Sequence, residues 1–318
     1  MESIRDRDPS GGPGAAVSST FEAGEAGTAV LDESFVEHRP MLLALAYRML
    51  GSVHDAEDTV QDAFVRWTGT DRAAIANPAA FLTTIVTRLA VDRLRSAVAR
   101  RETYVGPWLP EPLPTHPDDP ADTAALRDSA SIAMLLLMDR LTPVERAVFV
   151  LREAFALPYD EIATTLERSA ASCRQLHRRA VRRVAALPGP VPPADPARGR
   201  RLVEGFLSAA RDGDLDRLKA LLRDDVVYTT DGGGRARAAR RPILGADRAA
   251  RVFASLFARF YRTAELRPMW INHAPAVLIE RPRGQQVLYV FEFGADGRAG
   301  RLYAVVNPEK LAHLDVAG

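Results

Sequence analysis

Two proline-rich stretches divide this chain into three segments that must fold separately. Six prolines lie between Pro107 and Pro120, and five lie between Pro188 and Pro196. Proline fixes its φ angle and has no backbone N–H to donate, so neither stretch can form the interior of a helix or a sheet. We therefore expect both stretches to be semi-rigid linkers between separately packed domains.

The length of the chain agrees with this division, because 318 residues correspond to two or three domains of ordinary size. The expected units, in chain order, are a disordered tail at 1–30, a helical domain at 31–102, a linker at 103–123, a second helical domain at 124–187, a linker at 188–197 and a third domain at 198–318. The tail is rich in Gly, Ala, Ser and charge, a composition that does not bury a core.

Composition excludes several classes of protein. A hydrophobic fraction of 47% and a charged fraction of 26% are ordinary for a globular chain, which argues against a fibrous or wholly disordered protein. We expect a cytoplasmic protein that does not bind membranes, because no apolar run has membrane-spanning length and the N-terminus lacks the apolar part of a secretory signal. Cys173 is the only cysteine, so neither an internal disulfide nor a cysteine-based zinc site can form, and we expect it to be a small buried residue. We also expect no other metal and no cofactor.

The first folded segment, residues 35–101, has apolar residues at helical spacing, which predicts a small helical bundle. Within it, residues 55–67 place acidic side chains on one helix face and apolar side chains on the other. A later helix enters at Asn77 and Pro78, a capping residue followed by a proline at the first helical position, and becomes rich in arginine toward Arg101. Each helix taken alone is equally typical of a core helix with a solvated face.

The second folded segment has the pattern of a helix-turn-helix. Thr142, Pro143 and Glu145 are spaced as a capping box that begins a helix. A short helix at 158–166, a tight turn at 167–169 and a longer helix at 170–185 follow.

The longer helix has a strongly basic face. Six arginines and no carboxylate lie between Arg168 and Arg183, as expected for a helix that enters a DNA major groove. Ser172 and Gln175 are neutral and short enough to reach base edges. The alternative is a solvated basic face, which an arginine-rich coding genome also produces.

The third segment changes pattern from helices to strands. Two short helices within 200–222 and a third at 246–261 are expected, together with strands at 226–230, 276–280, 286–293 and 300–306. Helices followed by a strand meander indicate an α+β domain.

Three motifs in the helical segments resemble regions 2 and 4 of extracytoplasmic-function sigma factors of the sigma-70 family. They are the run Asp55-Ala-Glu-Asp-x-Val-Gln-Asp-x-Phe-x-x-Trp67, the helix entry Asn77-Pro-x-x-Phe-Leu82 and the helix-turn-helix entry Leu141-Thr-Pro-x-Glu-Arg146. The motifs occur in the order and at the separation typical of the family, and together they cover both helical segments. The resemblance implies a sigma factor that directs core RNA polymerase to promoters by reading their minus-ten and minus-thirty-five elements.

The resemblance also implies roles for individual residues. Those that would help dock the chain on core polymerase are Asp55, Glu57, Asp58, Gln61, Asp62 and Trp67. Those that would line the path of the minus-ten strand are Thr83, Thr84, Arg88, Asp92 and Arg93, next to a loop at 68–76 that would capture an extruded base. Those that would contact the minus-thirty-five element are Arg168, Ser169, Ser172, Arg174, Gln175, Arg178, Arg179 and Arg182.

The third segment resembles a SnoaL-like domain of the cone-shaped, nuclear-transport-factor type, which marks a subgroup of these sigma factors. The motifs that resemble the subgroup are Tyr104-x-Gly-Pro-Trp-Leu-Pro-Glu-Pro112, Asp231-Gly-Gly-Gly234 and Asn307-Pro-Glu-Lys-Leu311. The implied fold is therefore multidomain, with two all-α domains and a C-terminal α+β domain that controls them in cis and partly replaces a separate anti-sigma protein.

The residues that would make the regulatory contacts are Trp108, Leu109, Asp231, Gly232, Gly233, Gly234, Asn307, Pro308 and Lys310. Local alternatives stay open for each motif. Trp108 either packs against the C-terminal domain or covers the first bundle, the glycines are either a contact or only a flexible turn, and the 307–311 segment is either a latch or an inert tail.

The chief rival function is an enzyme, because relatives of this C-terminal fold use acidic or histidine side chains in a pocket. The candidate groups are Tyr228, Asp231, Trp270, His273 and Glu292. They show no His–Asp pairing and no metal-ligand spacing, so we expect no catalysis. A third hypothesis is that the pocket binds a small ligand and transmits its presence to the helical domains.

Overall fold

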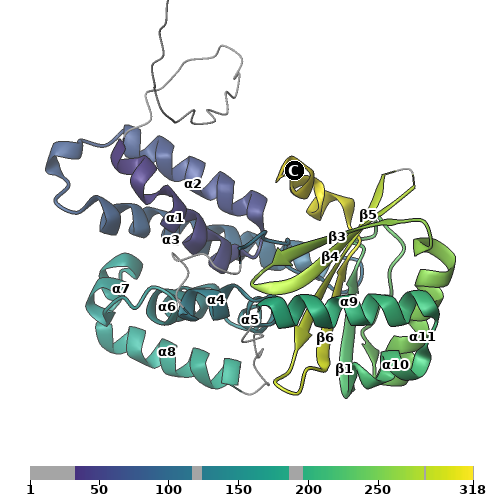
Figure 1. Cartoon of the computed structure of the whole chain (residues 1–318). Helices are drawn as coiled ribbons and strands as arrows, with labels where there is room; N and C mark the ends of the chain where they lie inside the picture. Colours follow the sequence, from purple (N-terminus) through teal and green to yellow (C-terminus); the bar gives the residue numbers. More distant parts are fainter. Residues whose placement is uncertain (1–32, 117–123, 186–195, 283, 318) are drawn as a thin grey trace, which may run out of the picture.

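The computed structural model describes residues 33–116, 124–185, 196–282 and 284–317, which form two helical modules beside an α+β domain (Figure 1). The expected tail at 1–30 and parts of both expected linkers, 117–123 and 186–195, lie outside the described residues. Within the described ranges, no helix has both the length and the apolar character needed to cross a membrane.

The first module contains three α-helices in its described residues. They are α1 (Glu33–Leu50), α2 (Val53–Thr68) and α3 (Pro78–Glu102), with a 3-10 turn at Arg72–Ala74. Side-chain caps set two of the helix starts, as the sequence predicts for the second of them. The Ser52 hydroxyl accepts from the Asp55 N–H at the start of α2, and the Asn77 side chain accepts from the Ala80 N–H at the start of α3.

The second module carries the helix-turn-helix. Its described helices are α4 (Ala124–Ala130), α5 (Ile132–Met138), α6 (Pro143–Glu153), α7 (Tyr159–Leu166) and α8 (Ala170–Ala185). The predicted capping box is present, because the Thr142 hydroxyl accepts from the Glu145 N–H while the Glu145 carboxylate accepts from the Thr142 N–H. Glu167 ends α7 in the left-handed conformation, with φ of 54°, which gives the sharp turn into α8. Cys173 is buried and unpaired, as predicted.

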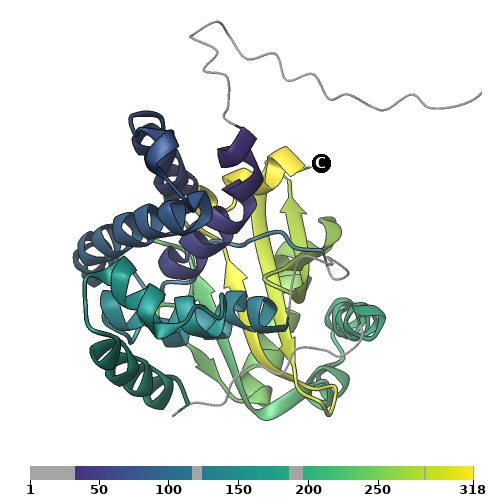
Figure 2. The same cartoon turned by 90° about the vertical axis from the view of Figure 1, so that its left-hand side faces the viewer.

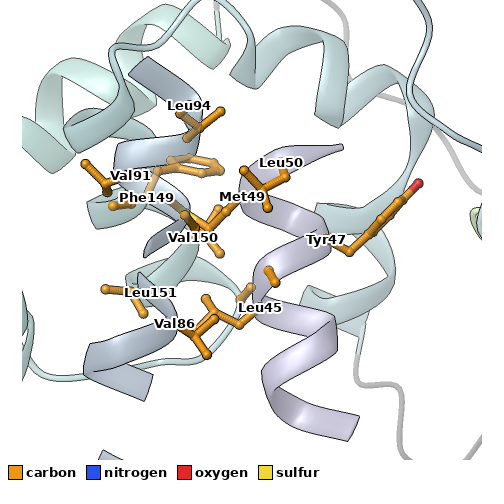
Figure 3. Packing of buried hydrophobic residues seen from close by; sticks show 14 of the residues in the cluster. Leu45, Tyr47, Met49, Leu50, Val86, Val91, Leu94, Phe149, Val150 and Leu151 are labelled. Carbon is orange, nitrogen blue, oxygen red and sulfur yellow. The ribbon is translucent and has the colours of Figure 1, made fainter. Parts of the chain in front are cut away.

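The two helical modules share one hydrophobic core. Figure 3 shows side chains of α1, α3 and α6 packed against one another, among them Met49, Val91 and Val150. Each of these three side chains is at most 5% exposed. The modules are therefore packed face to face, and are not held apart by the linker between them.

The C-terminal domain is an α+β unit. Its described helices are α9 (Pro196–Asp212), α10 (Leu215–Ala220) and α11 (Ala246–Leu256), extended by a π-helical turn at Phe257–Tyr261. Its strands are β1 (Leu222–Asp231), β2 (Ile243–Leu244), β3 (Glu265–Ile271), β4 (Ala274–Arg281), β5 (Gln285–Phe293) and β6 (Ala299–Val305). Two 3-10 turns, Pro308–Lys310 and Ala312–Ala317, end the described chain.

The sheet has the order β2-β1-β6-β5-β4-β3. Strands β3 to β6 form the antiparallel meander, and β1 lies parallel to β6. Strands β2 and β3 were not predicted from the sequence, and Pro268 at the centre of β3 is unfavourable for a strand. The structure explains the exception: β3 is an edge strand, so the missing N–H of Pro268 does not interrupt a ladder on its outer side.

Aromatic side chains fill the space between the helices and the sheet. The ring of Phe253 lies 4.7 Å from that of Phe206, 5.7 Å from Tyr228 and 4.8 Å from Tyr289. All four side chains are at most 2% exposed. In this fold the same space can form a ligand cavity. Here the aromatic side chains fill it, so it is a packed core.

The chain after α3 runs along the other face of the sheet, between the helical modules and the C-terminal domain (Figure 2). Pro114 forms an isolated bridge with Ile271 at the end of β3, and Leu109 is fully buried among residues of the sheet. The described part of this stretch, residues 103–116, is therefore packed against both neighbours.

Candidate polymerase and nucleic-acid interfaces

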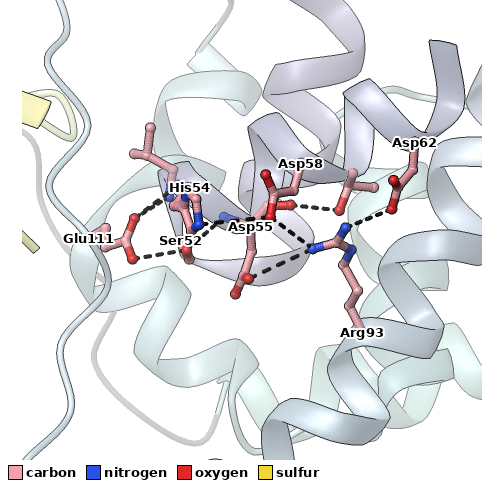
Figure 4. Close-up of polar contacts among 9 residues, drawn as sticks. Ser52, His54, Asp55, Asp58, Asp62, Arg93 and Glu111 are labelled. Atoms are coloured by element: carbon pink, nitrogen blue, oxygen red, sulfur yellow. Dashed lines mark hydrogen bonds and ion pairs between the residues drawn. The ribbon is translucent and has the colours of Figure 1, made fainter. Parts of the chain in front are cut away.

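The acidic face of α2 is partly neutralised from within the module. Arg93, on α3, reaches Asp62 at 2.7 Å, Asp58 at 3.6 Å and Asp55 at 3.9 Å (Figure 4). The Arg93 side chain is only 27% exposed. One arginine from the proposed DNA path thus binds three carboxylates of the proposed polymerase surface, although the two groups are separate in the sequence.

The remaining side chains of the proposed polymerase surface divide into two groups. Glu57 and Gln61 are exposed, as a docking surface requires. Trp67 is only 2% exposed and its ring lies 6.0 Å from that of Phe81. In this arrangement Trp67 is therefore a core residue that positions the end of α2 and presents no surface of its own.

The proposed minus-ten face of α3 contacts the helix-turn-helix. The Arg88 guanidinium donates to the Thr165 carbonyl at 2.9 Å and forms an ion pair of 2.9 Å with Glu167. Thr84 lies 3.3 Å from the Thr165 hydroxyl. Thr83 is half-buried nearby on α3, and one turn beyond Arg88 the exposed Asp92 pairs with Arg95 at 2.8 Å. Part of this face is therefore covered by α7 and its C-terminal turn.

The basic face of α8 is open to solvent. Arg168, Ser169, Arg174, Gln175, Arg178, Arg179 and Arg182 are exposed, and Ser172 is half-buried. Cys173, Ala180 and Val184 form the buried side of the same helix. The helix thus presents its arginines on one side, as a major-groove helix requires.

Asp231, at the end of β1, brings together three segments that are far apart in the sequence. Its carboxylate accepts from the Tyr104 hydroxyl at 2.6 Å, from the Leu109 N–H at 2.8 Å and from the Lys310 ammonium at 2.8 Å. Asp231 is fully buried and Lys310 is 6% exposed, so this is a buried ion pair whose oxygens are all satisfied. Burial, followed by the neighbouring Asp231 carboxylate, raises the pKa of Tyr104 and keeps its hydroxyl a donor.

The 307–311 segment completes this cluster. The Asn307 side chain accepts from the Glu309 N–H, which starts the 3-10 turn with Pro308 at its first position, and donates to the Tyr104 hydroxyl at 3.1 Å. Lys310 also donates to the Leu109 carbonyl and lies over the rings of Tyr104 and Trp108. The segment is therefore packed into the junction.

The three glycines after Asp231 leave room for these contacts. Gly233 has φ of 55°, and a Cβ at this position would lie 2.7 Å from the Tyr104 hydroxyl. Gly234 has φ of 73° and lies against Val105, while Gly232 is buried. Both the turn and the close contact require glycine.

Trp108 lies between the two domains that the sequence left as alternatives. A Cβ on Gly51, in the turn between α1 and α2, would lie 3.0 Å from the Trp108 ring, and Lys310 lies 4.5 Å above that ring. The predicted regulatory residues thus meet at one junction. Their regulatory role stays a prediction.

Three further residues make contacts at this junction that were not predicted from the sequence. Glu111 accepts from the N–H groups of Val53 and His54, and so caps α2 from the linker (Figure 4). Asn272 contacts the linker and both helical modules, and Glu292 accepts from the Ala133 N–H at the start of α5. Glu111 lies inside the quoted Tyr104–Pro112 motif, and Glu292 was named only as a candidate catalytic group, so neither contact was predicted.

The candidate catalytic groups do not converge. Asp231 is bound to Lys310, Glu292 to Arg301, and Tyr228 lies in the aromatic core. His273 binds Thr115 through its backbone, and Trp270 lines a separate hollow beside α9. No two of these five side chains form an acid–base pair.

Comparison with known proteins identifies the family of this chain. The family model of Sigma-70 region 2 matches residues 35–100, and that of Sigma-70, region 4 matches residues 131–184. ECF RNA polymerase sigma factor SigJ of Mycobacterium tuberculosis is 44% identical over 225 residues, which cover 70% of this chain and 72% of SigJ. A probable ECF sigma factor of the same organism, SigI, is 38% identical over 220 residues, covering 66% of this chain and 71% of SigI.

The likeness extends to the whole arrangement of domains. The crystal structure of M. tuberculosis SigJ matches with a TM-score of 0.68 at 34% identity, covering 87% of this chain and 97% of that one. A chain with two such helical modules is a transcription initiation factor. This chain belongs to the extracytoplasmic-function family of RNA polymerase sigma factors. The predicted fold, two all-α sigma domains followed by a SnoaL-like α+β domain, is confirmed.

Proposed function

We propose that the C-terminal domain controls this sigma factor in cis by holding its two helical modules in a closed arrangement. The observation that carries the proposal is the buried Asp231–Lys310 pair, which ties the linker between the modules to the C-terminal domain. The proposed roles of α2 in polymerase docking, α3 at the minus-ten element and α8 at the minus-thirty-five element complete this function.

The closed arrangement does not fit a promoter. The two promoter elements lie about 25 base pairs apart, which is about 85 Å at about 3.4 Å per base pair. Here Arg88 of α3 touches Thr165 and Glu167 at the end of α7, so the two reading modules are in direct contact. Simultaneous reading of both elements therefore requires the modules to separate.

The C-terminal domain contacts every part that would have to move. Asp231 holds the linker, Asn272 holds α1 through Tyr47, and Glu292 caps α5 of the second module. Such contacts favour one arrangement over the other, which is the requirement for control of a conformational equilibrium. We infer that a separate anti-sigma protein is not needed to keep the modules closed.

Asp231→Asn in the full-length chain tests the proposal. The substitution keeps the shape of the side chain and leaves Lys310 buried without a countercharge, which is destabilising by about 3–5 kcal/mol for a buried pair. We expect more run-off transcription with core polymerase than the unaltered chain gives. Asp225→Asn, which removes an exposed carboxylate on the same strand, is the matched control.

Unchanged transcription by the Asp231→Asn chain would reject control through this junction. Lower transcription with normal binding to core polymerase would instead show that the domain activates the sigma modules.

A hollow at the same junction favours a second function, binding of a small ligand. A cavity of about 450 Å³ is lined by α1, the linker and the β3–β4 turn, with Tyr47, Leu113, His116 and His273 among its residues. A molecule there would touch three parts of the closed arrangement at once and would favour that arrangement. Ligands that raise the melting temperature without changing promoter output would reject this function.

We do not propose catalysis for the C-terminal domain. We infer a cytoplasmic location, because a sigma factor acts on polymerase and chromosomal promoters.

A further inference from the structure

The loop after β1 carries an arginine cluster whose role is not explained by control in cis. Arg235, Arg237, Arg240 and Arg241 lie within seven residues, and no carboxylate occurs between Gly232 and Gly245. All four arginines are exposed. We call residues 235–241 the arginine loop.

Most of this charge is not neutralised within the chain. Arg235 pairs with Glu309 at 3.0 Å. Arg237, Arg240 and Arg241 form no ion pair with any residue that the structure describes. Three unpaired guanidinium groups on one short loop are therefore available to an anionic partner.

The arginine loop lies directly beside the end of α3. The linker residues Val105 and Gly106 follow α3 by only a few residues, and they pack against Gly234 and the backbone of Arg240. A hollow of about 460 Å³ is lined by residues of both the linker and the loop, with Arg237 and Arg240 among them. The loop therefore lies next to the C-terminal end of α3, whose sequence carries Arg95, Arg100 and Arg101.

We infer that the arginine loop binds backbone phosphates of promoter DNA next to the minus-ten element. Guanidinium groups bind phosphates strongly and without regard to base sequence. Continuity with α3 selects DNA as the partner. The inference therefore rests on the proposed assignment of α3 to the minus-ten element, and on an opening that moves α4–α8 away from α3 while the loop stays beside residues 105 and 106. The C-terminal domain would then contribute to affinity for promoters in addition to its control of the sigma modules.

The test is the salt dependence of promoter binding by holoenzyme assembled from core polymerase and the full-length chain. The variant R237Q/R240Q/R241Q should bind more weakly, and the slope of log affinity against log salt should fall by about one for each phosphate contact removed. The matched control, R248Q/R259Q/R262Q, removes three exposed arginines from α11 and the following turn, at the end of the molecule away from α1 and α2 (Figure 1). The control should leave the slope unchanged.

Arg88→Gln on α3 tests the placement of α3 separately, because Arg88 is the exposed arginine assigned to the minus-ten path. A reduced slope for Arg88→Gln with an unchanged slope for the loop variant rejects the arginine loop alone. Unchanged slopes for both variants reject the placement of α3 as well. An equal loss in the α11 control, or weaker assembly with core polymerase in the absence of DNA, also overturns the inference.

A cleavage probe gives a second measurement. Because Cys173 is buried, a Cys introduced at Arg240 can carry a DNA-cleaving reagent selectively. We expect backbone cuts beside the minus-ten element, and cuts elsewhere or none would contradict the inference.

Discussion

Asn272 is a buried polar residue that contacts three parts of the chain at once. Its amide donates to the Tyr47 hydroxyl at 2.6 Å and to the Ala130 carbonyl at 2.7 Å, and its carbonyl accepts from the Leu113 N–H at 3.1 Å. Asn272 also has φ of 51°, a left-handed conformation that asparagine tolerates better than most residues. The same residue type thus suits both the tight turn between β3 and β4 and the contacts across domains.

Two replacements of Asn272 separate the contribution of its hydrogen bonds from that of its positive φ angle. Asn272→Ala removes the hydrogen bonds and also places an alanine at positive φ, so we expect the free energy of unfolding to fall by about 3 kcal/mol. Asn272→Gly removes the same hydrogen bonds without the backbone strain and should cost less. Urea unfolding measures both. Equal losses for the two variants would show that backbone strain does not contribute.

Glu292 makes the stability of the folded chain depend on pH. Burial, opposed by Arg301, raises the pKa of Glu292 above its ordinary value of 4.5. The folded chain therefore holds this proton more tightly than the unfolded chain, so the stability that Glu292 contributes is complete below pH 4.5 and is lost as pH rises through the folded-state pKa.

The Glu292→Gln chain tests this assignment, because glutamine cannot ionise. We expect the free energy of unfolding to decline less steeply above pH 4.5 than in the unaltered chain, as measured by urea titrations at a series of pH values. Parallel pH profiles for the two chains would rule out Glu292 as the titrating group.

At the scale of elements, local signals were sufficient to predict most of the fold. The capping box at Thr142, the entry at Asn77 and the period of the apolar residues depend on neighbours within a few positions, so the sequence displays them directly. Strand β3 was missed because its tolerance of Pro268 depends on its position at the sheet edge. The junction was predicted only where the family resemblance supplied motifs.

The other contacts join residues that no local rule relates. Asn272 and Tyr47 are 225 positions apart, and Glu292 and Ala133 are 159 apart. Periodicity gives the exposed face of a helix but not the partner that covers it. The contact of Arg88 with α7 is a further example, because the sequence suggested only that this residue would bind DNA.

The arginine face of α8 predicts how charge reversal on a single helix changes DNA binding. Charge reversal in R174E/R178E should weaken binding to a minus-thirty-five duplex at least about tenfold, because phosphate and base contacts become repulsive. R211E/R217E on α9 and α10 makes the same charge change at exposed sites outside the helix-turn-helix and is the control. Promoter binding that survives the α8 change would assign the recognition surface to another helix.

For the whole molecule, the closed arrangement is also held by apolar packing. Val91 of α3 and Val150 of α6 lie in one core, so separation of the modules exposes both side chains. Burial of each such side chain stabilises the closed arrangement by about 1.5–3 kcal/mol. Opening is therefore unfavourable unless a partner covers the exposed surfaces. Core polymerase is such a partner, since it binds members of this family, and the C-terminal domain adds its own contacts to the closed side of the balance.

This balance can be measured as a distance. Val65 on α2 and Ala171 on α8 are exposed, and the sole natural cysteine is buried, so V65C/A171C accepts two dyes for energy transfer. We expect efficient transfer in the free chain and a large loss of transfer on binding to core polymerase and promoter, because the modules must then stand about 85 Å apart. Asp231→Asn should shift the free chain toward low transfer, since it weakens the closed state alone. If transfer is the same in the free chain, the Asp231→Asn chain and the promoter complex, the modules do not separate and the closed arrangement is not the controlled state.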